Sequence, residues 1–197
     1  MNPRDLEIWR RARPYLNVRN NDTHTLHAYW LARALLSQYP EANEAIVLPA
    51  ILLHDTGWKH VPEAERMLAI KPGSNRPDLV RKHEIEGAAI AWTLLLGLNL
   101  RADDITAIID GHDTRPAAIS LEDALVKDAD KLWRLTPHGM ATIHGWFGFS
   151  PAFIIEQVWI GGHGGRLLTN AARAMAQAFV ASAEAAGAVP GLMQKDI

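Results

Sequence analysis

The sequence predicts an all-α protein that folds as one domain. Apolar residues recur three and four positions apart along most of the chain, which is the spacing of one face of a helix. No run of β-branched residues is bounded by hairpin turns. With 197 residues, of which 48% are apolar and 21% charged, the chain can bury one core. We expect a single helical bundle over residues 1–197 with a C-terminal helical extension.

Proline, glycine and capping residues set the expected helix boundaries in the first part of the chain. Pro14 should stop the first helix, and Asn21 and Asp22 are candidates to cap the second. Gly57 can leave the third helix through a positive φ angle. The expected helices span residues 4–13, 23–39, 41–55 and 63–69.

Similar signals divide the second part. Pro77 begins a long helix that Gly97 closes, and Gly111 ends the next one. The segment Ser120-Leu-Glu-Asp123 has the form of a capping box. The expected helices span residues 78–96, 102–110, 120–135 and 166–186. Residues 136–165 are rich in glycine and aromatic residues and give no clear assignment.

Charge and composition exclude several classes of function. The formal net charge of −2 offers no basic surface of the kind that nucleic-acid binding needs, so we expect no nucleic-acid partner. The chain has no cysteine, which rules out disulfides and thiolate metal sites and suits a reducing compartment. Its start lacks the apolar stretch of a signal peptide, and the longest apolar run is too short to cross a bilayer. We therefore expect a cytoplasmic protein without a membrane partner.

Several histidines, one of them beside Asp55, fall where the expected helices begin or end, and Asp130 lies inside a later helix. Helix ends converge in a bundle more readily than helix middles, so these side chains can meet in one site. Imidazole and carboxylate donors without sulfur suit Mn, Fe, Zn, Co or Ni, and Mg fits a carboxylate-rich position. The candidate ligands for one or two such ions are His24, His54, Asp55, His83, His112 and Asp130.

The order of these residues resembles the metal-binding pattern of the HD-domain superfamily of metal-dependent phosphohydrolases. The similar segments begin with His24-Thr-Leu-His-Ala-Tyr-Trp-Leu-Ala32 and include Leu52-Leu-His-Asp-Thr-Gly57, which is like the central motif of the superfamily. Ala129-Asp-Lys-Leu132 resembles its closing motif, while His83-Glu-Ile-Glu-Gly87 and Gly111-His112 resemble the extra histidines of members with two metals. The resemblance covers about residues 20–135, the motif-bearing core.

The resemblance implies an all-α HD domain and a ligand set. His24, His54, Asp55 and Asp130 would bind a first ion, and His83 and His112 a second, with Asp55 bridging the two. The implied activity is hydrolysis of a phosphate ester of a small molecule, such as a nucleotide, by metal-activated water. Asp55 would be catalytic through the metal. Lys59 and Arg115, near the motifs in sequence, are candidate phosphate contacts.

Two other functions stay open on the sequence alone. Di-iron oxygenases of the HD type use the same order of histidine and aspartate ligands and cleave a carbon bond with dioxygen. A sensor or scaffold without turnover can also retain the ion for stability. Oxygen uptake and phosphate release distinguish the three.

Overall fold

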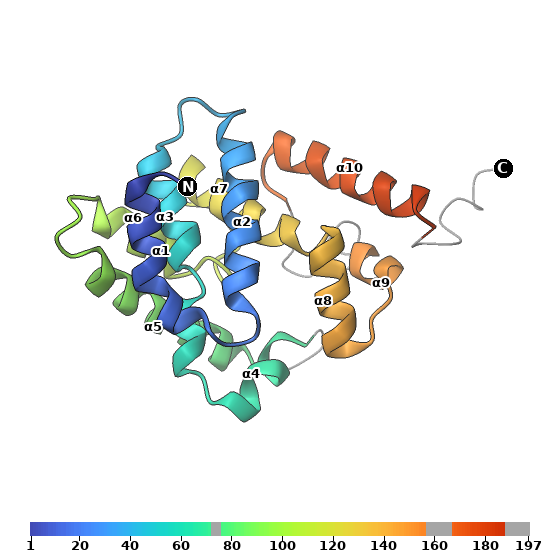
Figure 1. Cartoon of the computed structure of the whole chain (residues 1–197), viewed down its shortest axis with the longest axis horizontal. Coiled ribbons are helices and arrows are strands. Elements are labelled where there is room, and N and C mark those ends of the chain that lie inside the picture. The colour runs from blue at the N-terminus through green and yellow to red at the C-terminus, as the bar shows by residue number, and fades with distance from the viewer. Residues whose placement is uncertain (72–75, 157–166, 188–197) are drawn as a thin grey trace.

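The computed structural model describes residues 1–71, 76–156 and 167–187, which form helices joined by turns (Figure 1). These ranges contain no β-strand, so the all-α prediction is confirmed. The elements, in chain order, are α1 (Pro3–Leu16), α2 (Asn21–Leu36), α3 (Glu44–Leu53), the 3₁₀ helix η1 (Thr56–His60), α4 (Glu63–Ile70), α5 (Pro77–Leu95), α6 (Ala102–Ile109), α7 (Leu121–Trp133), α8 (Pro137–Phe147), α9 (Pro151–Ile155) and α10 (Asn170–Ala185).

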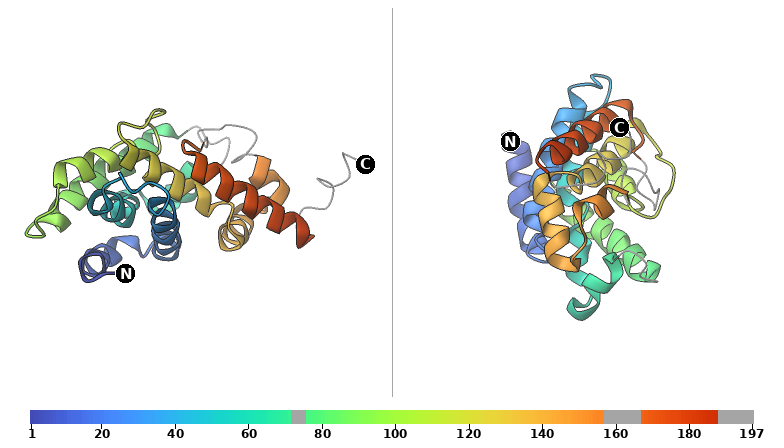
Figure 2. Two further views of the ribbon diagram at one scale, coloured as in Figure 1. Left: turned by 90° about the horizontal axis from the view of Figure 1, so that it is seen from above. Right: turned by 90° about the vertical axis from the view of Figure 1, so that its right-hand side faces the viewer.

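Helix α3 forms the centre of the bundle. It packs against α1, α2, α6 and α7. Seen from above, α1 lies on one side of α2 and α3, and α5, α6 and α7 lie on the other (Figure 2). Every residue from Ile46 to Leu53 is buried, as expected for a helix that is apolar all round. The C-terminal end of α3 therefore carries His54 and Asp55 into the interior.

Helices α8, α9 and α10 form the expected C-terminal extension at one side of the bundle (Figures 1 and 2). Helix α10 packs against α7. The carboxylate of Asp128 on α7 accepts hydrogen bonds from the backbone N–H groups of Leu168 and Thr169 and from the Thr169 hydroxyl, at 2.7–2.8 Å. Asp128 thus ties the start of α10 to the bundle.

Three boundaries in the first half differ from the prediction. Helix α1 continues through Pro14 to Leu16, because Ile8, Ala12 and Leu16 form one fully buried face whose packing offsets the hydrogen bond that proline removes. Helix α2 begins at Asn21, so neither predicted residue is its N-cap; Asn20 occupies that position without a side-chain cap. Helix α3 spans Glu44–Leu53 rather than 41–55, since Asn43 caps its start.

Two helices lie in residues 136–156, the described part of the segment that the sequence left unassigned. Thr136 caps α8 and Ser150 caps α9, and each cap is followed by proline at the first helical position. The last helix starts later than predicted, at Asn170, because the Thr169 side chain accepts a hydrogen bond from the Ala172 N–H and caps it. The predicted start near Arg166 lies outside the described residues.

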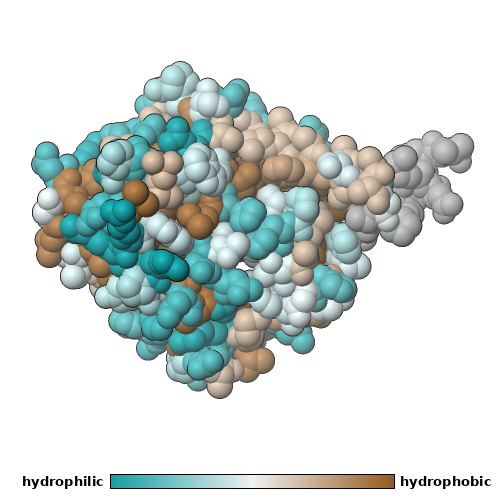
Figure 3. Space-filling view, in the orientation of Figure 1, coloured by the Kyte–Doolittle hydropathy of each residue, from teal (hydrophilic) through white to brown (hydrophobic). Residues whose placement is uncertain are grey.

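The surface alternates between hydrophilic and hydrophobic patches on the face shown in Figure 3, and the side chains over α10 are mostly of the mildly apolar kind. The alanine content of this helix explains that pattern. Within the described ranges, no helix has the length and the continuous apolar character needed to cross a membrane.

Gly57 acts through close packing rather than through a positive φ angle. It lies inside η1, and a Cβ atom at this position would be 1.9 Å from the backbone oxygen of His83 and 2.5 Å from the nitrogen of Gly87. Its φ angle is not among the positive ones, so the predicted helix exit is wrong. The residue lets η1 lie directly on α5, which contains His83.

Replacing Gly57 with Ala should destabilise the protein by about 3 kcal/mol or more, because the added methyl group meets backbone that cannot rotate away. Thermal unfolding followed by circular dichroism measures the effect. Gly145→Ala is the matched control: a Cβ there meets nothing within 4 Å, so the change should leave stability equal or higher. Equal melting temperatures for the Gly57 variant and the wild type would contradict the close packing.

Candidate metal centre

The six predicted ligands lie together in the interior. None of these residues is more than 5% exposed. They come from His24 on α2, His54 and Asp55 after the end of α3, His83 on α5, His112 after α6, and Asp130 on α7. The structure thus brings distant parts of the chain to one point. With Asp113, the potential metal-ligating atoms form two outer groups, and a third group of His54, Asp55 and His112 links them.

The first group consists of His24, His54 and Asp130. The Nε2 atoms of the two histidines are 3.1 Å apart. Oδ1 of Asp130 lies 3.2 Å from Nε2 of His24 and 3.7 Å from Nε2 of His54. Ligands that share one transition-metal ion at bond lengths near 2.1 Å are about 3.0–3.4 Å apart, so only small shifts would let this group bind an ion.

The second group consists of His83, His112 and Asp113. Nε2 of His83 is 3.3 Å from Nε2 of His112, and Oδ2 of Asp113 lies 3.6 and 3.8 Å from the two nitrogens. The sequence reasoning did not single out Asp113 as a ligand. Its position directly after His112 in a turn was the available signal.

Asp55 lies between the two groups. Its Oδ2 atom is 3.5 Å from Nε2 of His24, and its Oδ1 atom is 3.6 Å from Nε2 of His54. Oδ1 also lies 3.8 Å from Nε2 of His83 and 3.9 Å from Nε2 of His112. A carboxylate in this position can bridge two ions, as the resemblance implied.

Backbone carbonyls fix the orientation of two imidazoles. Nδ1 of His54 donates to the carbonyl oxygen of Ile51 at 2.8 Å, and Nδ1 of His112 donates to that of Ile109 at 2.9 Å. A carbonyl oxygen can only accept a hydrogen bond, so each Nδ1 carries a proton. The Nε2 atom of each ring is then the one that faces the other potential metal ligands. Such outer hydrogen bonds are typical of histidines that bind metals.

Trp58 and Trp133 enclose the donors. Nε1 of Trp58 donates to Oδ1 of Asp55 at 3.0 Å, and the same indole stacks on the His83 ring with centroids 4.1 Å apart and an interplanar angle of 14°. Trp133 meets the His24 ring edge-on at 4.5 Å. The tryptophans therefore hold the Asp55 carboxylate and two imidazoles in place.

Two buried charges hold the turn that carries His112 and Asp113. The Glu84 carboxylate accepts hydrogen bonds from the N–H groups of Asp113 and Thr114 and from the Thr114 hydroxyl, at 2.6–2.8 Å. From another side, the Lys127 ammonium donates to the carbonyls of Gly111 and His112 at 2.7 and 2.8 Å. The sequence reasoning assigned Glu84 and Lys127 no such positioning role, because only the fold brings the backbone groups of this turn near them.

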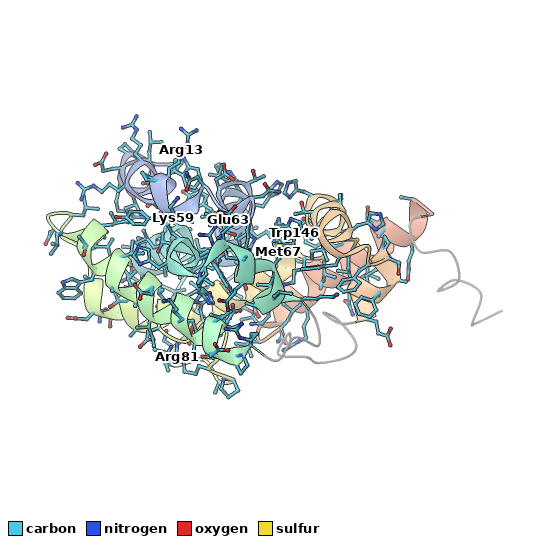
Figure 4. The ribbon with its side chains drawn as sticks, turned by 90° about the horizontal axis from the view of Figure 1, so that it is seen from below. Arg13, Lys59, Glu63, Met67, Arg81 and Trp146 are labelled. Carbon is cyan, nitrogen blue, oxygen red and sulfur yellow. The ribbon has the colours of Figure 1, made fainter. Side chains whose placement is uncertain are left out.

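The remaining two predicted site residues have other partners. The Lys59 ammonium donates to Oδ1 of Asn17, and Figure 4 shows Lys59 on the side of the molecule where Arg13 of α1 lies. The Arg115 guanidinium donates to the carbonyl of Asp110 at 3.0 Å and to the Asp123 carboxylate at 3.0 Å. Both engage protein groups outside the metal-ligand cluster, and their contact with phosphate stays a prediction.

Burial and charge set the protonation of the cluster. Burial lowers the pKa of His54, but the charges of Asp55 and Asp130 outweigh this effect and raise it to about 9. Burial and the neighbouring His112 lower the pKa of His83 to about 4. Burial acts to raise the pKa of Asp55, yet the charge of His54 and its neighbours holds it below its usual value. Without an ion, the cluster therefore combines ionised carboxylates with a proton on His54.

Binding of a divalent ion should therefore release a proton and strengthen as the pH rises. A ligand imidazole must give up the proton at its donor nitrogen, and His54 holds one at pH values below about 9. The apparent affinity should increase about tenfold per pH unit from pH 7 upward and level off above that pKa. Calorimetric titration with Mn²⁺ in buffers of different ionisation enthalpy counts the proton. A binding heat that is the same in every buffer would contradict this protonation state.

Comparison with known proteins agrees with this geometry. The family model of the HD domain matches residues 21–135, which is more than half of the chain. The matched range extends from the start of α2 to just beyond α7 and includes every donor of the two groups and the bridging Asp55. No curated protein and no solved structure gives a match. The chain therefore belongs to the HD domain family.

Proposed function

We propose that the protein is a metal-dependent phosphohydrolase that acts on a phosphate ester of a small molecule. The observation that carries the proposal is the arrangement of two His-His-Asp groups on either side of one buried carboxylate, Asp55. Membership of the HD domain family supports hydrolysis as the class of reaction.

The donor set fits one or two divalent ions. His24, His54 and Asp130 would hold one, His83, His112 and Asp113 the other, and Asp55 would bridge them. Imidazole and carboxylate ligands suit Mn, Fe, Zn, Co or Ni, with Mg accepted where carboxylates dominate. A bound ion supplies Lewis acidity, which lowers the pKa of a water ligand toward neutrality and offsets charge on phosphoryl oxygens.

The protein's own groups position and shield this chemistry. Trp58 donates to Asp55 and so fixes the direction of the bridging carboxylate. The side chain of Asp113 is 26% exposed, whereas that of Asp55 is 6% exposed. Substrate and water would therefore be able to approach past Asp113.

The proposal is tested by metal analysis of the purified protein and a phosphate-release screen with the metal that is found. The screen covers nucleotides, sugar phosphates and aryl phosphates. Release that depends on the metal supports the proposal. A metal-replete protein that releases no phosphate from any of these substrates would favour a sensor that keeps the ion for stability.

Asp55→Ala should reduce metal-dependent turnover by about a thousandfold or more, because it removes the carboxylate shared by both groups. The control is His144→Ala, whose imidazole lies outside the cluster and contacts the carbonyl oxygen of Phe149. This control should retain wild-type turnover. Full activity of the Asp55 variant with its metal still bound would remove Asp55 from the mechanism.

A dinuclear oxygenase is the second candidate, and the presence of two complete donor groups favours it over other enzyme classes. Such an enzyme would consume dioxygen when loaded with iron and partly reduced. An oxygen electrode distinguishes the two: we expect no uptake with the substrates that release phosphate. Oxygen uptake that depends on substrate, without phosphate release, would establish the oxygenase instead.

A further inference from the structure

Arg19 has an unusual backbone next to the metal-ligand cluster. It lies between α1 and α2 with φ 53°, and Asn20 follows with φ 56°. Two consecutive residues other than glycine in the left-handed region are energetically unfavourable, and such outliers occur preferentially at functional sites.

The guanidinium of Arg19 is held by aromatic rings. Its central carbon lies 4.3 Å from the centroid of the Trp58 ring and 5.8 Å from that of Trp146, which is labelled in Figure 4. His83 stacks on Trp58 as well. One indole thus contacts both a candidate metal ligand and the guanidinium, which places Arg19 beside the cluster.

Two nitrogens of this guanidinium are buried without an acceptor. Nε and Nη1 of Arg19 have no hydrogen-bond partner among the described residues. The carboxylates of Asp55, Asp113 and Asp130 act on the charge of Arg19, yet none of them accepts a hydrogen bond from it. Burying a charged N–H group without an acceptor costs free energy. These atoms are therefore suited to donate hydrogen bonds to a ligand that carries an acceptor.

Arg134 supplies a second guanidinium. It follows α7 directly, one turn after Asp130, and its Nη1 atom lies 3.5 Å from Oδ2 of that residue. Its side chain is 34% exposed, so it retains free donors. Arg19 and Arg134 are both under the influence of the same three carboxylates, those of Asp55, Asp113 and Asp130.

The balance of charge favours an anion. Three carboxylates, those of Asp55, Asp113 and Asp130, lie near the two guanidinium groups of Arg19 and Arg134. Each divalent ion adds two positive charges, so even a single ion makes the site positive. A site with excess positive charge and free guanidinium donors attracts a dianion more strongly than a monoanion.

We infer that Arg19, together with Arg134, forms an anion-binding subsite for a phosphate dianion beside the metal-ligand cluster. The substrate class is then phosphate monoesters, whose terminal phosphate carries close to two charges and three acceptor oxygens, rather than diesters. This inference rests on the proposed function, which it deepens. The same donors would bind inorganic phosphate, the product of monoester hydrolysis, and that ion serves as the probe.

The test is calorimetric titration of the metal-loaded protein with inorganic phosphate. Arg19→Gly should weaken phosphate binding about ten- to a hundredfold, as expected for loss of charged hydrogen bonds. Glycine adopts φ 53° without strain, so the melting temperature should stay equal or rise and the metal content should not change. Arg19→Lys keeps the charge without the planar fork and should bind phosphate with intermediate affinity.

Arg33→Ala is the matched control. Its guanidinium lies 5.7 Å from the centroid of the Trp30 ring, so it is also an arginine beside an indole, but Trp30 is an exposed residue. Phosphate affinity should be unchanged in this variant. Wild-type phosphate affinity in Arg19→Gly would overturn the inference. A lower melting temperature with unchanged phosphate affinity would do the same, because it would assign Arg19 a structural role.

Turnover separates this inference from the proposed function. With a monoester such as an aryl phosphate, Arg19→Gly should raise KM about tenfold or more, while the matching diester should be a poor substrate for the wild type. If the wild type hydrolyses the diester better than the monoester, the inference fails and the proposed hydrolase stands. If phosphate binding depends on Arg19 but no ester is hydrolysed, the inference stands and the proposed hydrolase fails.

Discussion

The burial of one ionised carboxylate is the constraint on which the rest of the structure depends. Asp55 is only 4% exposed, and an uncompensated charge at such a place costs several kcal/mol. The Trp58 N–H group and the surrounding imidazoles offset part of that cost. The apolar helix α3 has to end at this point, and η1 has to turn back immediately so that the indole reaches the carboxylate. The contact between η1 and α5 thus helps to keep the Trp58 N–H group beside the Asp55 carboxylate.

Hydrogen bonds from residues around the cluster keep its potential metal ligands from moving apart. Glu84 of α5 and Lys127 of α7 form hydrogen bonds with the turn after α6. The two potential metal ligands of this turn, His112 and Asp113, are therefore fixed from two helices. Both charged groups are buried, and each forms hydrogen bonds with backbone atoms of this turn. A cluster of like-charged carboxylates would otherwise push its members apart. Rigid support of this kind keeps donor atoms near the positions that an ion requires.

The sequence predicted the parts of this structure that depend on local pattern and chain order. The helical periodicity and the order of His24, His54-Asp55 and Asp130 needed no knowledge of contacts. Prediction from the sequence failed where contacts between residues far apart in the chain determine the structure. Pro14 remains helical because of packing that only the bundle provides, and Gly57 is needed for a close approach to α5. The surroundings of Arg19 were equally inaccessible, because the indole beside its guanidinium lies in η1, far along the chain.

The hydrogen bonds of Asp128 connect the extension to the chemistry. Asp128 and Asp130 are two positions apart on α7 and point in different directions, one toward Thr169 and the other toward His24. In a chain that ended before Leu168, the buried Asp128 would lose its hydrogen-bond donors. Asp128 lies in the same helical turn as Asp130, a candidate metal ligand. A protein truncated at this point would consequently have to form the site at reduced stability.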